Sequence, residues 1–124
     1  MNSRDLIVLC FTVILLLSIG LFAIYNNSFS EGTVLDMTSD EKLDEGDSLV
    51  LKLTDKDGFP VSNQKVEINL TDDDGITENF TMNTDSNGET RLEDMIEGNF
   101  SFISKYYGDG DHKESTVTDE ITVK

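Results

Sequence analysis

The sequence contains little of what usually stabilises small exported domains or equips enzymes. It has one cysteine, one histidine, one proline and no tryptophan. The cysteine, Cys10, lies in an apolar run, so no disulfide can form within the chain and the fold must be held by its core. Basic residues are scarce too, since nine Lys and Arg stand against 25 Asp and Glu, a net charge of −16. With no basic stripe to neutralise phosphates, the chain is not expected to bind nucleic acid.

Residues suited to catalysis are equally scarce. The one histidine, His112, falls in a loop rich in Gly and Asp, where we expect no partner to prepare it for acid–base work. The carboxylates fall in turns or on outward strand positions, where nothing raises their pKa. We therefore predict that the protein is not an enzyme and has no catalytic residues and no cofactor.

An uncharged run of 20 residues, 6–25 (LIVLCFTVILLLSIGLFAIY), lies near the N-terminus. As a helix it spans about 30 Å, which matches the hydrocarbon core of a bilayer. We predict that it binds the bilayer as an uncleaved, single-pass signal anchor. Arg4 precedes the run and the next basic residue is Lys42, so residues 1–5 form a cytoplasmic stub and the C-terminal part is extracellular.

Two alternatives to the anchor remain open. A secretory signal could be cleaved after Ser28 or Ser30, although the run is longer than a typical signal and no Ala-x-Ala site follows. Lipidation at Cys10 is disfavoured because Leu9, rather than a small residue, precedes it and most of the apolar run follows it. A buried cysteine that acts as a small hydrophobic residue is the simpler interpretation.

The rest of the chain divides into an acidic tether, residues 26–47, and a domain, residues 48–124. Within the tether, Thr33–Met37 could form a first edge strand. In the domain, Leu49, Leu51 and Leu53 alternate with the outward Val50, Lys52 and Thr54, as expected of a strand with one buried face. The same alternation recurs in KVEINLT (65–71), ENFTMNT (78–84), NFSFISKYY (99–107) and a last strand containing Ile121 and Val123.

Turn signals separate these strands. Asp57-Gly58, Asp74-Gly75 and Asn87-Gly88 each pair a residue that tolerates a left-handed backbone with glycine. Helix signals are absent from residue 47 onward. The pattern predicts an all-β fold, an antiparallel β-sandwich of about seven strands, preceded by the one N-terminal transmembrane helix.

Three segments in order, LTDKDGFPVSNQKVEINL, TMNTDSNGETRL and GNFSFISKYYGDGDH followed by ITV, resemble the bacterial immunoglobulin-like repeat. They are most similar to the Ig-like repeats of adhesin-like surface proteins of methanogenic archaea. The likeness covers residues 48–123 and departs from the family at His112, where those repeats have an aromatic residue. It implies an Ig-like sandwich, a cell-surface location, and a structural, adhesive or binding role without catalytic residues.

Acidic turns make calcium the one metal worth considering, because hard cations want several oxygens from one loop. None of the turns completes an EF-hand loop, and Asp and Asn are also ordinary turn residues, so turn chemistry is the preferred interpretation. The calcium candidates are Asp55, Asp57, Asp72, Asp73, Asp74, Asp85, Asn87, Asp109 and Asp111.

Four N-x-Ser/Thr sequons could accept glycans, at Asn26, Asn69, Asn79 and Asn99. The last three place Asn on the outward phase of a strand. A strand that alternates polar and apolar residues can also contain this motif by chance.

Together these features predict a membrane-anchored Ig-like module that contacts an unknown surface protein or glycan. The alternative is a pilin-like subunit that assembles into a filament through its apolar N-terminal helix. That class requires a processing site with Gly or Ala before the apolar run, and Ser3-Arg4-Asp5 supplies only the basic residue.

Overall fold

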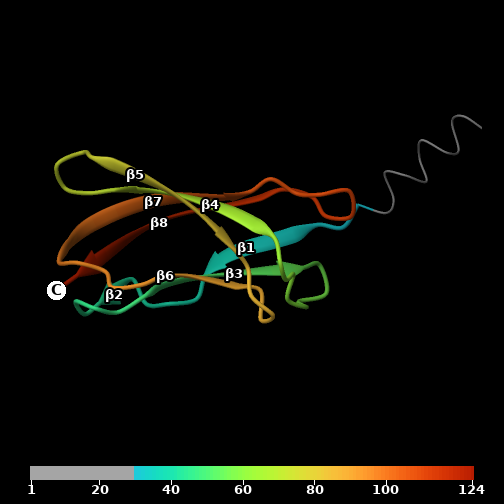
Figure 1. Ribbon diagram of the computed structural model, residues 1–124, viewed down its shortest axis with the longest axis horizontal. Coiled ribbons are helices and arrows are strands. Elements are labelled where there is room, and N and C mark those ends of the chain that lie inside the picture. The colour runs from blue at the N-terminus through green and yellow to red at the C-terminus, as the bar shows by residue number, and fades with distance from the viewer. Residues whose placement is uncertain (1–29) are drawn as a thin grey trace, which may run out of the picture. The chain divides into compact units, whose positions relative to one another are not determined.

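The computed structural model describes residues 30–124, which form eight strands and no helix (Figure 1). The strands are β1 (Thr33–Met37), β2 (Lys42–Leu43), β3 (Leu49–Asp55), β4 (Lys65–Thr71), β5 (Thr77–Asn83), β6 (Glu89–Leu92), β7 (Gly98–Tyr106) and β8 (Ser115–Val123). The all-β prediction is confirmed for this part of the chain. The predicted stub (1–5) and anchor (6–25) lie outside it, and no helix among residues 30–124 is long and apolar enough to cross a membrane.

The strands form two sheets that lie one over the other (Figure 1). The three-stranded sheet has the order β1-β3-β6, and the five-stranded sheet has the order β2-β8-β7-β4-β5. Neighbouring strands are antiparallel except β2 and β8, which pair in parallel through Lys42 with Thr122 and Leu43 with Val123. The longest pairing, β7 with β8, runs from Gly98 opposite Val123 to Tyr106 opposite Ser115.

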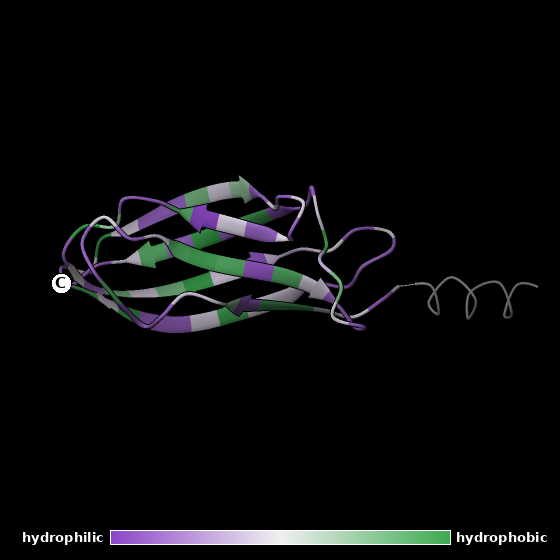
Figure 2. Cartoon of the chain, turned by 90° about the horizontal axis from the view of Figure 1, so that it is seen from below, coloured by the Kyte–Doolittle hydropathy of each residue, from purple (hydrophilic) through white to green (hydrophobic). Residues whose placement is uncertain are grey.

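The core lies between the sheets and is built from every second residue of the strands. Figure 2 shows the hydrophobic and hydrophilic residues alternating along them. The buried apolar side chains are Leu35, Leu43, Leu49, Leu51, Leu53, Val61, Val66, Ile68, Leu70, Met95, Phe100, Phe102, Tyr106, Ile121 and Val123. The inward positions predicted for 49–53, 66–70 and 100–106 are therefore confirmed, including Ser104, whose hydroxyl donates to the carbonyl of Glu67 at 2.8 Å.

One side chain differs from the alternation, and two follow it but are only partly buried. Val50 was predicted to face water but is only 8% exposed. The chain between β1 and β2 lies against it, because the Thr38 N–H donates to the Val50 carbonyl and the Val50 N–H donates to Ser39 Oγ. Phe80 and Met82 pack inward as predicted but are only partly buried, since β5 is an edge strand.

The folded unit begins well before residue 48. The edge strand predicted at Thr33–Met37 is confirmed as β1. Both β1 and β2 fall inside the stretch predicted as a tether, and residues Glu31–Lys124 form one compact unit. Hydrogen bonds from both ends of this stretch explain the correction: the Glu31 N–H donates to the Asp111 carbonyl at 2.8 Å, and the Glu45 N–H donates to the Lys124 carbonyl at 3.0 Å. Among the described residues, the buried core residues lie within this unit, so residues 31–124 pack around a core of their own.

Three turns repeat one geometry. Asp55, Asp72 and Asp85 each begin a turn, and Oδ1 of each accepts the N–H groups of the residues two and four positions later at 2.8–3.0 Å. The glycine in the fourth position of each turn has a positive φ of 74–85°. A carboxylate that caps the turn and a glycine that accepts the left-handed backbone fix these three connections.

Gly88 differs from the other two turn glycines in its surroundings. A Cβ at this position would lie 2.5 Å from the carbonyl oxygen of Leu53 and 3.1 Å from Cβ of Pro60. The Gly88 carbonyl also accepts the Leu53 N–H at 2.8 Å. By contrast, a Cβ on Gly75 meets nothing within 4 Å. The turn after β5 is therefore packed against the backbone of β3, whereas the turn after β4 projects into water.

This difference predicts unequal effects of one substitution. Gly75→Ala should cost about 1–2 kcal/mol, because alanine is strained at positive φ. Gly88→Ala should cost about 1–3 kcal/mol more, because the added methyl also overlaps backbone that cannot move away cheaply. Urea denaturation of residues 31–124 measures both, and equal destabilisation of the two variants would contradict the close approach at Gly88.

Candidate interaction surface

The outward side of the five-stranded sheet is the most distinctive surface of the domain. The registers of β4, β5, β7 and β8 place alternate residues of these four strands on it, and we call this set the outer face. Its members are Lys65, Glu67, Asn69, Thr71, Thr77, Asn79, Thr81, Asn83, Asn99, Ser101, Ile103, Lys105, Thr116, Thr118, Glu120 and Thr122. Threonine and asparagine predominate.

The outer face has no net charge, although the protein is strongly acidic. Its two lysines and two glutamates cancel. Without Asp5 and Arg4, the rest of the chain has 24 acidic and eight basic residues, a balance of −16. That whole balance therefore lies off the outer face. At its margin Lys42 of β2 pairs with Thr122 and adds a further positive charge.

Several polar side chains of the outer face have partners on the face or beside it. Glu67 lies opposite Lys105 in the register and accepts a hydrogen bond from the Tyr107 hydroxyl at 2.7 Å. The ammonium of Lys105 lies 4.7 Å from the centre of the Tyr107 ring. Farther along, the hydroxyls of Thr71 and Thr77 are 2.8 Å apart. The ammonium of Lys105 also lies 3.6 Å from the carboxylate of Glu114, just outside the set, so two of the four charged side chains of the face have a partner.

An exposed isoleucine occupies the middle of this polar surface. Ile103 is 52% exposed. It lies opposite Asn69 on one side and Thr118 on the other, in a shallow depression that Thr71 and Ser101 also line. A large apolar side chain that is half exposed gains little from folding, so its position suits contact with another molecule.

Three of the four sequon asparagines lie on the outer face. Asn69, Asn79 and Asn99 are all exposed there, and Asn26 lies outside the described residues. Asn69 and Asn79 sit directly opposite each other on β4 and β5. Side chains in such a pair are about 5 Å apart at Cβ, so two glycans could hardly be accommodated together.

The calcium candidates do not come together. Asp55, Asp72 and Asp85 accept backbone N–H groups of their own turns, as described above, while Asp57, Asp74 and Asn87 supply some of those N–H groups. Asp73 Oδ2 accepts the Asn99 N–H at 3.2 Å. Among residues 30–124 no group of three His, Cys, Asp or Glu side chains is placed to hold a metal ion. The side-chain oxygens of Asp55, Asp72 and Asp85 are engaged in turn chemistry.

Hydrogen bonds also lower the pKa of two of these carboxyl groups, Asp85 and Asp109. N–H groups of Glu89 and Asn87 hold the pKa of Asp85 below its ordinary value. For Asp109, burial raises the pKa, but hydrogen bonds from Asp111 and His112 outweigh it and the net shift is downward. Asp109 Oδ1 accepts the N–H groups of Asp111 and His112 and lies 3.0 Å from Nδ1 of His112. His112, the predicted loop histidine, therefore contacts Asp109 within the loop between β7 and β8 and stabilises that loop.

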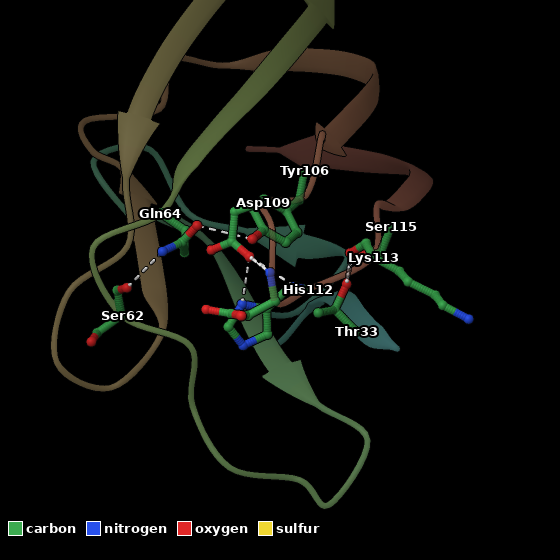
Figure 3. A network of polar contacts seen from close by, with 9 residues as sticks. Thr33, Ser62, Gln64, Tyr106, Asp109, His112, Lys113 and Ser115 are labelled. Atoms are coloured by element: carbon green, nitrogen blue, oxygen red, sulfur yellow. Dashed lines mark hydrogen bonds and ion pairs between the residues drawn. The ribbon is translucent and has the colours of Figure 1, made fainter. Parts of the chain in front are cut away.

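A buried tyrosine beside this loop was not anticipated as a polar site. Tyr106 is 2% exposed, and its hydroxyl donates to Oε1 of Gln64 at 2.9 Å, next to Asp109 (Figure 3). Burial, reinforced by the negative charge of Asp109, raises the pKa of Tyr106 to about 12. The alternation predicted that this ring points inward, but Gln64 lies before a strand and nothing in its neighbourhood indicates the contact.

A second surface feature is an apolar groove at the opposite end of the domain. It has a volume of about 250 Å³ and lies where β5 and the loop after β6 approach. The exposed Ile76 and Ile96 flank it, and Phe80 lies within it. Acidic side chains border it: Asp72, Glu78, Glu93 and Asp94. Nothing in the described residues covers this groove.

Comparison with known proteins adds no family. No protein-family model matches the chain, and no curated protein matches it. The resemblance to Ig-like repeats therefore rests on the motifs themselves.

The turn chemistry leads to a prediction about cations. Magnesium and calcium at about 1 mM should raise the melting temperature of residues 31–124 by similar small amounts, because both screen the repulsion among 24 carboxylates. A dedicated calcium site would instead add about 2.7 kcal/mol at a hundredfold excess over its dissociation constant. A shift specific to calcium that disappears when Asp72, Asp73 and Asp74 are changed to Asn would contradict the turn interpretation.

The buried tyrosine predicts an alkaline transition. Its pKa is about 12 in the folded protein against 10.0 ordinarily, so the stability it contributes is complete below pH 10 and is lost as the pH rises toward 12. Tyr106→Phe should lower stability at neutral pH, because the bond to Gln64 is lost, and should flatten the decline above pH 10. Urea midpoints across this range measure the effect. Tyr107→Phe is the comparison: the hydrogen bond to Glu67 also raises the pKa of Tyr107, but less than burial raises that of Tyr106, so an equal flattening there would contradict the assignment.

Proposed function

We propose that the chain is a membrane-anchored, cell-surface Ig-like module whose role is contact with other molecules rather than catalysis. The outer face is the observation that carries this proposal. It is broad, exposed and uncharged overall on a protein of charge −16, and it has an isoleucine at its centre.

The strand order supports the Ig-like assignment. In Ig-type sandwiches, strands A, B and E share one sheet, while strands C, F and G share the other and C′ extends it next to C. The sheet orders β1-β3-β6 and β8-β7-β4-β5 match that arrangement, with β1 as A, β3 as B and β5 as C′. The three motifs that resemble Ig-like repeats point in the same direction.

The membrane anchor rests on the sequence. The uncharged run 6–25 is long enough for one bilayer crossing, and Arg4 is on the side expected to remain in the cytoplasm. The folded unit begins at Glu31, so residues 26–30 separate it from the uncharged run in the sequence.

A non-catalytic role is supported by how the polar groups are used. The carboxylates at the turns accept backbone N–H groups, and His112 contacts Asp109 within one loop. Acid–base catalysis requires such groups to face a bound substrate instead.

Topology is tested by cysteine labelling in intact cells. In a Cys10→Ser background, Ser62→Cys places a thiol on an exposed loop of the folded unit, and Ser3→Cys places one before the apolar run. A membrane-impermeant maleimide should label Cys at 62 in intact cells and Cys at 3 only after permeabilisation.

Each other outcome has a distinct meaning. Labelling of position 3 alone in intact cells would overturn the orientation. Loss of the Ser3→Cys tag from the mature protein, with a matching decrease in mass, would show a cleaved signal instead of an anchor. Release of the full-length protein by alkaline carbonate would overturn membrane insertion.

A further inference from the structure

We propose that the outer face is a weak self-association surface and that a second copy of this chain is its partner. This inference rests on the contact role proposed above and gives that role a specific occupant. It concerns the folded unit alone, so it can fail while the membrane topology stands.

Charge selects this face among the surfaces of the domain. Two copies of a protein with a balance of −16 repel each other, and the repulsion is greatest where acidic surfaces approach. The apolar groove illustrates this, because four carboxylates border it and two grooves brought together would oppose eight. On the outer face, lysines and glutamates cancel, Glu67 already accepts a hydrogen bond from Tyr107, and Lys105 lies 3.6 Å from the carboxylate of Glu114. Two copies can therefore approach there at the least electrostatic cost.

The chemistry of the face suits contact with an identical face. Threonine supplies both a methyl group and a hydroxyl, and Thr71 and Thr77 already form a hydroxyl pair across two strands. Threonines placed around Ile103 would offer apolar area near the centre and hydrogen bonds around it. A twofold axis near Ile103 brings the two isoleucines together and removes both from water.

The area of the outer face indicates how strong the self-association can be. Four strands about 4.8 Å apart, each contributing about seven residues of about 3.3 Å, make a plane of about 440 Å². Two such planes bury about 900 Å², slightly below the range of stable interfaces. The association should therefore be weak in solution. For copies held in one membrane, the higher effective concentration would favour it.

Glycans would compete with this contact. Asn69 lies directly opposite Ile103, and Asn79 and Asn99 share the face. A glycan on any of them would hold two faces apart. Association should therefore be tested on residues 31–124 produced without glycosylation, a unit that has its own core.

Sedimentation equilibrium from about 10 µM to about 1 mM measures the association. Raising the salt concentration from about 20 mM to about 500 mM should strengthen it, because salt screens the repulsion between the acidic parts of the two copies. An association that salt weakens would depend on ion pairs and would overturn the proposal.

Two matched variants locate the contact. Ile103→Lys and Ile96→Lys make the same change at isoleucines that are 52% and 66% exposed, and both reduce the net negative charge. If general repulsion alone governed association, both would strengthen it. The proposal predicts that Ile103→Lys weakens association at least about tenfold, because two ammonium groups would meet at the axis. Ile96→Lys should leave it unchanged or slightly stronger.

Two results would overturn the inference. One is a protein that remains monomeric over the whole concentration range at high salt. The other is association that survives Ile103→Lys, which would place the contact elsewhere, for example on the free edge of β5. Circular dichroism of both variants shows whether the fold is kept, and the exposure of both side chains predicts that it is.

Discussion

The burial of one side of each sheet against the other is the constraint on which the rest of the structure depends. Residues 30–124 contain no cysteine, so no covalent link supports the fold. The buried set is small, and inward polar groups such as those of Ser104 and Tyr106 are hydrogen-bonded, although among residues 30–124 the buried hydroxyl of Thr90 has no partner. The aspartate-capped turn at Asp72 adds a second constraint, since it joins β4 to its neighbour β5 and fixes their register, whereas the turns at Asp55 and Asp85 connect strands of different sheets.

This constraint leaves the outward positions free to serve other ends. An acidic protein could place carboxylates on every exposed position of its larger sheet without loss of the core. The sequence instead places threonine and asparagine there, with charges that cancel, and puts the acidic residues in turns, loops and the strand margins. Since the core does not demand this division, it points to a requirement at the surface itself, and contact with another molecule is one such requirement.

Much of the fold could be predicted because its signals are local. Period-two alternation identified β3, β4, β5 and β7, and Asp-Gly and Asn-Gly pairs identified the turns. What failed depends on residues far apart in the sequence. The strand β2 is two residues long and exists because it pairs with β8, and Val50 is buried because Thr38 and Ser39 bond to its backbone. The sequence pattern does not reveal such contacts, and residues 31–47 were therefore predicted to be a tether with an edge strand at Thr33–Met37.

The candidate surface, too, could be predicted only in part, because some of its features depend on how distant strands pair. Each strand alone shows that Asn69, Asn79 or Ile103 points outward. The register alone shows that Asn69 lies between the other two and that the charges at the outward positions of the four strands sum to zero. The register also changes the meaning of the sequons. Taken separately they are independent acceptor sites, but on one face Asn69 and Asn79 compete for the same space, and Asn69 adjoins Ile103. A glycan at Asn69 and a second protein copy at Ile103 would therefore exclude each other from the centre of this face.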